Sequence, residues 1–192
     1  MSIRIGIFAS GNGSNAINLN SHFDQHPEIE ISKVYCNNPM AGVITKAFSN
    51  NIPVQVFTKR QLNNGHVLEQ LKRDQIDVIV LAGFLWLVPE DLIKSFPSRI
   101  INIHPALLPH YGGKGMYGMR VHEAVVQNQE KESGITIHLV DEEYDNGDHL
   151  FQASVSLSNN ETPESLAAKI HELEYQHFPV VVENYVLRPG QQ

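Results

Sequence analysis

Asn102 and His104 are the residues of this 192-residue chain whose types and spacing best suit carbonyl chemistry. They are two positions apart at the end of the apolar run Ile100 to Ile103, which reads as a buried strand, so both side chains point the same way. An asparagine amide donates to a carbonyl oxygen, and histidine exchanges a proton near neutral pH. The pair predicts a site that stabilises the oxyanion formed on an attacked carbonyl, with a loop histidine beside a turn-capping asparagine as the plain alternative.

Asp145 is a third candidate, in the acidic segment Asp141 to Asp148. The following Asn146-Gly147 marks a turn that can carry a side chain into a cleft. A carboxylate beside His104 would stabilise the charged form of the ring and fix its orientation. Acidic segments of this kind are usually solvated loops, so the residue types alone leave the role of Asp145 open.

A glycine-rich turn, Ser10-Gly11-Asn12-Gly13-Ser14-Asn15, follows the first apolar run and precedes a predicted helix. Unpaired backbone N–H groups at a helix N-terminus favour an anion, and the glycines allow a phosphate to approach closely. The turn lacks the third glycine of a dinucleotide fingerprint and the Gly-Lys-Ser/Thr of a P-loop. It therefore predicts a monophosphate site, with an ordinary capped turn as the alternative.

The elements that must position these residues alternate between strands and helices over the first hundred residues. This alternation predicts an α/β fold with a doubly wound, mostly parallel, Rossmann-like sheet covered by helices on both faces. Ligands of such sheets bind beyond the carboxyl ends of the strands, so we expect residues 10–15, 83–88 and 102–109 to meet there. The predicted strands are Ile3–Phe8, Ile29–Cys36, Val54–Phe57, Val78–Ala82 and Ile100–Ile103, and the predicted helices are Ala16–Phe23, Ala41–Asn50, His66–Asp74 and Pro89–Phe96.

The pattern changes after residue 110. A flexible loop, a short helix, two strands and a long final helix are expected, and no internal repeat or domain linker interrupts residues 1–192. These elements are the loop Tyr111–Gly118, the helix His122–Asn128, the strands Gly134–Val140 and His149–Leu157, and a helix capped at Thr162 with the stripe Leu166, Ile170, Leu173 and His177.

Composition narrows the class of protein. A hydrophobic fraction of 42% can build a core, and the formal charge of −7 argues against general nucleic-acid binding. Cys36 is the single cysteine, which favours a reducing, cytoplasmic location without a disulfide. No apolar segment approaches the roughly 20 residues needed to span a bilayer. No histidine spacing demands a metal, although His122 and His138 flank the predicted cleft.

Four segments occur in the order seen in folate-dependent formyltransferases, and the chain resembles the phosphoribosylglycinamide formyltransferase family from Ile3 to about Val186. The Asn-x-His-Pro-x-x-Leu-Pro element is shared by the wider group, whereas the Ser-Gly-Asn-Gly-Ser-Asn turn is more specific to that family. The four segments are residues 10–15, Leu81-Ala82-Gly83-Phe84, Asn102-Ile103-His104-Pro105-Ala106-Leu107-Leu108-Pro109 and the loop that contains Asp145.

The resemblance implies transfer of a formyl group from the co-substrate 10-formyltetrahydrofolate to the amine of glycinamide ribonucleotide, in purine synthesis and without a metal. It implies a single domain, with a phosphate-binding half up to about residue 100 and a catalytic, folate-binding half after it. Asn102 would bind the formyl oxygen, His104 would act as general acid, and Asp145 would support His104. The implied ligand contacts are Gly13, Ser14 and Asn15 for the phosphate, Glu174 for the ribonucleotide, and Leu85, Trp86, Leu87, Val88 and Asn102 for the folate.

The sequence departs from the family at Trp86, in the loop Tyr111–Met119 and in lacking a clear counterpart of a folate-contacting arginine, and other functions stay open. Trp86 stands where many members have arginine, and the loop Tyr111–Met119, with Lys114 at its tip, is longer than in many relatives.

A formyltetrahydrofolate deformylase would share the trio but normally has an added N-terminal domain, and amino-sugar or methionyl-tRNA formyltransferases usually have added C-terminal domains. A folate- or phosphate-binding module is the non-enzyme alternative. The expected partners are small molecules, without nucleic acid or membrane, for a monomer or homodimer.

Overall fold

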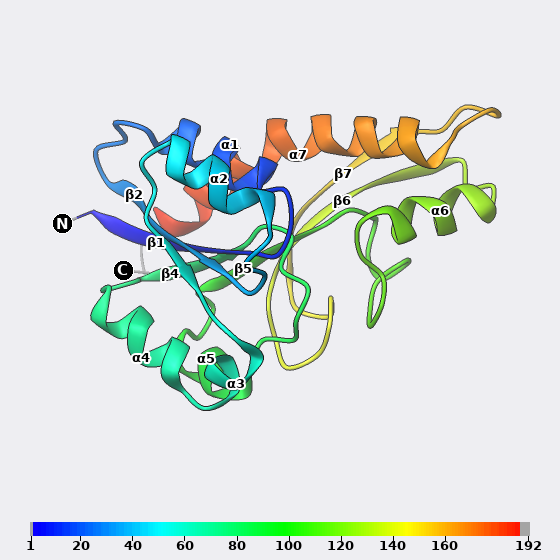
Figure 1. Ribbon diagram of the computed structural model, residues 1–192. Helices are drawn as coiled ribbons and strands as arrows, with labels where there is room; N and C mark the ends of the chain where they lie inside the picture. The colour runs from blue at the N-terminus through cyan, green and yellow to red at the C-terminus, as the bar shows by residue number, and fades with distance from the viewer. Residues whose placement is uncertain (1, 189–192) are drawn as a thin grey trace.

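The computed structural model describes residues 2–188, in which one seven-stranded sheet forms the centre of the molecule (Figure 1). The strands are β1 (Ile3–Ala9), β2 (Ile29–Cys36), β3 (Val54–Val56), β4 (Val78–Leu81), β5 (Ile100–His104), β6 (Glu132–Leu139) and β7 (His149–Ser156). Their order is β3-β2-β1-β4-β5-β6-β7. The first five strands pair in parallel, and β6 and β7 add antiparallel pairs at one edge. The predicted mostly parallel, doubly wound sheet is confirmed.

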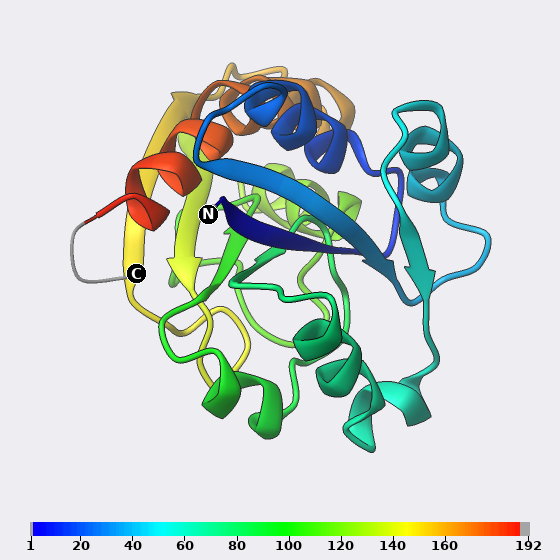
Figure 2. The ribbon, with the colours of Figure 1, turned by 90° about the vertical axis from the view of Figure 1, so that its left-hand side faces the viewer.

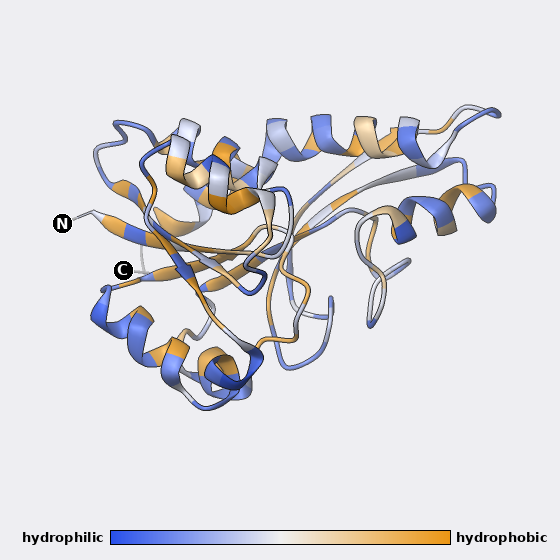
Figure 3. Cartoon of the chain, in the orientation of Figure 1, coloured by the Kyte–Doolittle hydropathy of each residue, from blue (hydrophilic) through white to orange (hydrophobic). Residues whose placement is uncertain are grey.

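Helices cover both faces of the sheet, as predicted. They are α1 (Ser14–Phe23), α2 (Gly42–Ser49), α3 (Lys59–Asn63), α4 (His66–Arg73), α5 (Glu90–Ser95), α6 (Met119–Gln127) and α7 (Pro163–Val186). Figures 1 and 2 show α1, α2 and α7 on one face and α3, α4 and α5 on the other, and α6 packs against α7. Figure 3 shows the apolar residues concentrated in the strands and on the inner sides of the helices.

The alternation of side chains along each strand builds a separate core on each face. Ile5 and Ile7 of β1 enter the core beneath α1, α2 and α7, while Phe8 enters the core above α3, α4 and α5. All four residues of β4 are buried, as expected for a central parallel strand that is covered on both faces.

Helix α3 is an element that the apolar pattern did not predict. It has only five residues, and Leu62 is its single buried side chain. The sequence did contain a signal for it, because Thr58 and Gln61 form a capping box at its N-terminus.

Helix α7 begins at the predicted cap, where Thr162 and Ser165 form a capping box. Its predicted apolar stripe was partly wrong, because the helix packs along a row of residues four apart. Leu173 and His177 are only half-buried. The buried row is Leu166, Ile170, Glu174 and Phe178, so a carboxylate occupies a position otherwise reserved for apolar side chains.

The strand order reverses between β1 and β4, because β1 leads to β2 on one side while β4 lies on the other. A crevice forms at such a reversal, outside the carboxyl ends of the strands. The turn at residues 10–15 follows β1, and residues 82–88 follow β4, so both border this crevice. Of the helices in residues 2–188, none combines the length and apolar character that crossing a membrane requires.

Candidate active site

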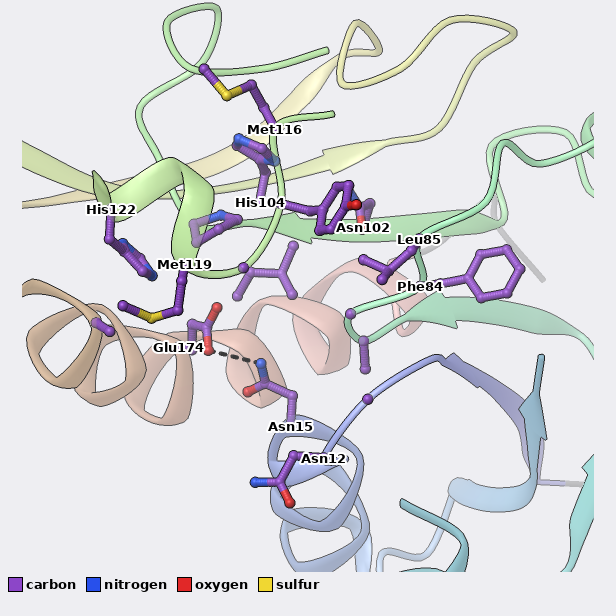
Figure 4. Close-up of a pocket in the computed structure, with 18 of the residues that line it drawn as sticks. Asn12, Asn15, Phe84, Leu85, Asn102, His104, Met116, Met119, His122 and Glu174 are labelled. Carbon is purple, nitrogen blue, oxygen red and sulfur yellow. Dashed lines mark hydrogen bonds between the residues drawn. The ribbon is translucent and has the colours of Figure 1, made fainter. Parts of the chain in front are cut away.

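A cavity of about 430 Å³ lies at the carboxyl ends of β1, β4 and β5 (Figure 4). This volume suits a small-molecule substrate. The cavity brings together all three segments that were expected to meet. Its lining includes Gly13, Ser14 and Asn15 after β1, Gly83 and Leu85 after β4, Asn102 and His104 of β5, Asp145, and Glu174 of α7.

The turn at residues 10–15 presents the N-terminus of α1 to the cavity. Gly13 caps this helix in the left-handed conformation, with φ of 77°. The turn lies against α2, where the Val43 N–H donates to the Gly11 carbonyl oxygen over 3.1 Å. The first N–H groups of an α-helix have no partner within the helix and carry its positive dipole end, so this terminus suits an anion.

Replacing Gly13 with alanine should destabilise the protein by about 2 kcal/mol, because overpacking and an unfavourable φ act together. An added Cβ at Gly13 would lie 2.8 Å from the Val43 Cα, a backbone atom that cannot move aside easily. The free energy of unfolding in urea measures the effect. Gly11→Ala is the matched control, because its Cβ would meet no atom within 4 Å. Equal stability of the two variants would contradict the close approach of this turn to α2.

Asn102 and His104 point to the same side of the sheet, as predicted. Their neighbours Ile101 and Ile103 enter the core beneath α7, so the two polar side chains face the opposite side. His104 is the last residue of β5 rather than the first residue of the loop, and its side chain is almost fully buried. The strand backbone therefore fixes the position of both groups.

Antiparallel β6 adds a second pair of polar residues beside the first. His138 lies opposite Asn102 in the register, and Thr136 lies opposite His104. The Thr136 hydroxyl donates to the Ala106 carbonyl oxygen over 2.7 Å and accepts from the Leu108 N–H over 3.0 Å. Thr136 thus holds the chain segment that leaves β5 just after His104.

His138 and Asp145 hold the Asn102 amide. His138 Nδ1 lies 2.7 Å from the Leu139 carbonyl oxygen, a contact that requires a proton on Nδ1 and leaves Nε2 as an acceptor. The Asn102 amide nitrogen lies 3.0 Å from that Nε2 and 3.4 Å from Asp145 Oδ1. One amide N–H is thus fixed by His138, while the second makes only a long contact and can serve a ligand.

Both ring nitrogens of His104 face oxygen atoms. Nε2 lies 2.8 Å from the Tyr111 carbonyl oxygen, and Nδ1 lies 3.4 Å from Asp145 Oδ1. A doubly protonated imidazole satisfies both contacts, since each nitrogen is then a donor. The ring is therefore held in a fixed orientation from which it can release a proton.

Asp145 reaches the cavity from the loop between β6 and β7. The turn at Gly147 brings this loop tightly against β6, because a Cβ there would lie 2.0 Å from the Leu139 carbonyl oxygen. Burial alone would raise the pKa of the Asp145 carboxyl. A hydrogen bond from His104, the charge of His104 and the Gly113 N–H, 2.9 Å from Oδ2, together hold that pKa well below its usual range. Asp145 is therefore a carboxylate in the folded protein.

Glu174 forms a polar cluster on the opposite wall of the cavity. Its Oε2 accepts from the Asn15 amide over 2.9 Å and lies 2.8 Å from His171 Nδ1 (Figure 4 shows the first contact). The hydrogen bond to Glu174 raises the pKa of His171. These contacts explain how a carboxylate is tolerated in the buried row of α7.

The segment 85–88 contributes to the cavity through its first residue. Leu85 lines the cavity, and its backbone N–H donates to the Ser10 hydroxyl oxygen over 3.0 Å. Leu87 is exposed, and Val88 is buried in the core above α5. The segment is thus tied to the turn after β1.

The Trp86 ring packs into an aromatic cluster. Its centroid lies 6.2 Å from the Phe57 ring and 6.3 Å from the Phe84 ring. An arginine at this position could not make the same edge-to-face contacts, so the departure from the family pattern is accommodated by packing.

Three histidines in or beside the site were not assigned from the sequence. His138 and His122 were noted as flanking the cleft, and His171 was set aside with the histidines that lack metal-like spacing. The three-residue spacing of His171 and Glu174 on one helix was a usable signal for their contact. Within residues 2–188, no group of three or more potential ligands is arranged to hold a metal ion.

The chain is similar in sequence to characterised formyltransferases. A family model described as formyl transferase matches residues 3–182. The chloroplastic phosphoribosylglycinamide formyltransferase of Arabidopsis thaliana is 39% identical over 186 residues, which cover 93% of this chain and 64% of that protein. This chain thus spans less than two thirds of the plant relative. The phosphoribosylglycinamide formyltransferase of Bacillus subtilis is 31% identical, with 94% of this chain and 93% of that protein covered.

A solved structure shares the fold over nearly its whole length. The crystal structure of phosphoribosylglycinamide formyltransferase from Bacillus halodurans matches with a TM-score of 0.86 and 33% identity, and the match covers 96% of each chain. The sequence resemblance is confirmed by the family match and by this structural likeness. The chain belongs to the formyl transferase family.

Proposed function

We propose that this protein transfers a formyl group from 10-formyltetrahydrofolate to the primary amine of glycinamide ribonucleotide, giving formylglycinamide ribonucleotide and tetrahydrofolate. The observation that supports this most strongly is the content of one cavity. It joins the anion-binding terminus of α1 to the Asn102, His104 and Asp145 trio, with Glu174 between them. A substrate with a phosphate at one end and an amine at the other fits this arrangement.

Binding of the ribonucleotide uses the wall formed by α1 and α7. The N–H groups of Gly13, Ser14 and Asn15 hold the phosphate at the positive end of the helix dipole. The second oxygen of Glu174, Oε1, accepts from a hydroxyl of the ribose, since only Oε2 is occupied by Asn15 and His171. These contacts direct the amine toward β5.

The residues of β5 and the Asp145 loop act on the reacting groups. When bound, 10-formyltetrahydrofolate supplies the formyl carbon that the amine attacks. The Asn102 N–H that makes only the long contact with Asp145 donates to the formyl oxygen and stabilises the negative charge that develops there. His104 moves a proton toward the departing nitrogen, and Asp145 keeps the ring oriented for this step.

We propose that the folate is bound by apolar side chains and by polar backbone groups. Phe84, Leu85 and Met116 line the cavity and give it apolar surface that suits a flat ring. Backbone groups of residues 85–88 supply the polar contacts, because the Trp86 side chain is engaged in the aromatic cluster.

Features of the whole chain support proposals on its domain organisation, partners and location. We propose that residues 1–192 act as one formyltransferase domain, because a single sheet carries both halves of the site. The net charge of −7 favours small-molecule substrates over nucleic acid. One buried, free thiol at Cys36 is consistent with a cytoplasmic location. A monomer or homodimer is expected, and sedimentation of the full chain would distinguish them.

A comparison of acceptors tests the proposal. Purified protein with 10-formyltetrahydrofolate should form tetrahydrofolate rapidly with glycinamide ribonucleotide, and far more slowly with glycinamide riboside, which lacks the phosphate. An amino-sugar nucleotide should not serve as acceptor. Equal rates with the riboside and the ribonucleotide would contradict the assignment of the α1 terminus to the substrate phosphate.

A further inference from the structure

His122 is a buried histidine in the cavity wall that the proposed mechanism does not use. It comes from α6, which packs against α7, and its side chain is 4% exposed. Figure 4 shows it at the same end of the cavity as Glu174 and Met119. A histidine in such a place needs a reason, because burying a polar ring without partners costs stability.

The two nitrogens of His122 differ in their surroundings. Nδ1 is fully enclosed and has no hydrogen-bond partner among residues 2–188. Because His122 lines the cavity, the ring meets the cavity through its other edge, which carries Nε2. An orphaned buried N–H is rarer than an orphaned buried acceptor, so the proton belongs on Nε2. His122 therefore presents an N–H donor to the cavity.

The charge state of His122 agrees with a donor role. Burial lowers the pKa of this histidine, and the charges of His171 and His104 act in the same direction, while Glu174 opposes them. The ring is neutral near pH 7, so it cannot form an ion pair with Glu174. A neutral N–H donor beside a carboxylate acceptor is a pair of groups that suits a hydroxyl-bearing ligand.

We propose that His122 is a specificity-determining residue, whose Nε2–H donates a hydrogen bond to an oxygen of the same ribose diol that donates to Glu174. This proposal rests on the proposed function, since it names the ribonucleotide as the ligand. The Glu174 carboxylate accepts a hydrogen bond from a hydroxyl group, and the His122 N–H donates a hydrogen bond to a hydroxyl oxygen. A hydroxyl group both donates and accepts, so the ribose diol satisfies both residues together.

The thermal stability of a His122 variant distinguishes a ligand-binding role of this residue from a purely structural role. Phenylalanine keeps the ring but removes both nitrogens, including the enclosed Nδ1. Replacing an unpaired buried polar atom with an apolar one is neutral or stabilising. His122→Phe should therefore melt at the same temperature as the wild type or higher, although its substrate binding is weakened. If His122 served only packing, its replacement would not weaken substrate binding while leaving the melting temperature unchanged or higher.

Kinetics of the full chain test the proposal. His122→Phe should raise the KM for glycinamide ribonucleotide about tenfold, the effect of losing one hydrogen bond. The KM for 10-formyltetrahydrofolate and kcat at saturation should stay unchanged. His122→Gln should restore much of the affinity, because its amide nitrogen places a donor near the position of Nε2. An unchanged KM for the ribonucleotide, or an equal rise in both KM values, would overturn the proposal.

A binding measurement keeps the proposal testable if His122→Phe does not fold. The ¹⁵N resonance of His122 Nε2 in the wild type should shift when ribose 5-phosphate is added, and should not shift with inorganic phosphate. No shift with ribose 5-phosphate would overturn the proposal. Because this experiment needs no turnover, it is independent of formyl transfer. A wild type that shows the shift but transfers no formyl group would contradict only the proposed function.

Discussion

His104→Ala should lower kcat by about 10²–10⁴-fold, the usual contribution of a positioned general acid. In the folded protein the His104 ring is held between the Tyr111 carbonyl oxygen and Asp145. His138, on the neighbouring strand β6, cannot replace it, because His138 is committed to Asn102 and to its own backbone. Initial rates at saturating concentrations of both substrates measure the effect.

Ligand binding should survive in the His104→Ala variant. The proposed phosphate and ribose contacts come from α1 and α7, whereas the polar contacts of His104 are with Tyr111 and Asp145. Calorimetry should give nearly the wild-type dissociation constant for glycinamide ribonucleotide. His110→Ala is the control, because His110 is exposed nearby on the same chain segment and does not line the cavity. Retained turnover in His104→Ala would remove this residue from its proposed role.

Asp145→Asn should lower kcat by roughly 10²-fold and also lower stability by about 2 kcal/mol near pH 7. The amide keeps the shape of the side chain but has no negative charge. It therefore interacts more weakly with His104 and cannot offer two carboxylate oxygens to His104 and the Gly113 N–H.

The stability effect of Asp145 depends on pH in a defined direction. The folded-state pKa of Asp145 is lowered, so its contribution is fully present above the unfolded value of about 3.9. It is lost as the pH falls through the lower folded-state pKa. Urea unfolding of the wild type and Asp145→Asn should therefore differ at pH 7, and the difference should shrink progressively as the pH falls below about 4. Asp148→Asn, at an exposed position of the same loop, should show no such difference. A constant gap from pH 7 to pH 3 would contradict the ionised, hydrogen-bonded carboxylate.

The fold was largely predictable because its strands are short apolar runs separated by clear breakers. Residues 29–36 form β2 with the predicted bounds, and most other ends differ by a few residues. Helix α3 was missed because five residues cannot establish a helical period. The α7 stripe was partly wrong because the prediction included Leu173 and His177 and not Glu174, whose burial is compensated by contacts with Asn15 and His171.

The site was predictable where it depends on neighbours in the sequence. Asn102 and His104 share one side of a strand, and that relation follows from a spacing of two. His138 could not be assigned in the same way, because its place beside Asn102 depends on the antiparallel register of β6 against β5. Asp145 is 41 residues from His104, and no local rule brings a loop carboxylate to a strand end. The resemblance to a known family supplied that residue.

The destination of the formyl carbon tests the proposed function most directly. The full chain would be incubated with glycinamide ribonucleotide and 10-formyltetrahydrofolate that carries ¹³C in the formyl group, and the products would be followed by NMR. We expect the label to appear in formylglycinamide ribonucleotide, one equivalent for each tetrahydrofolate formed. Label that appears only in formate would contradict formyl transfer and indicate a deformylase.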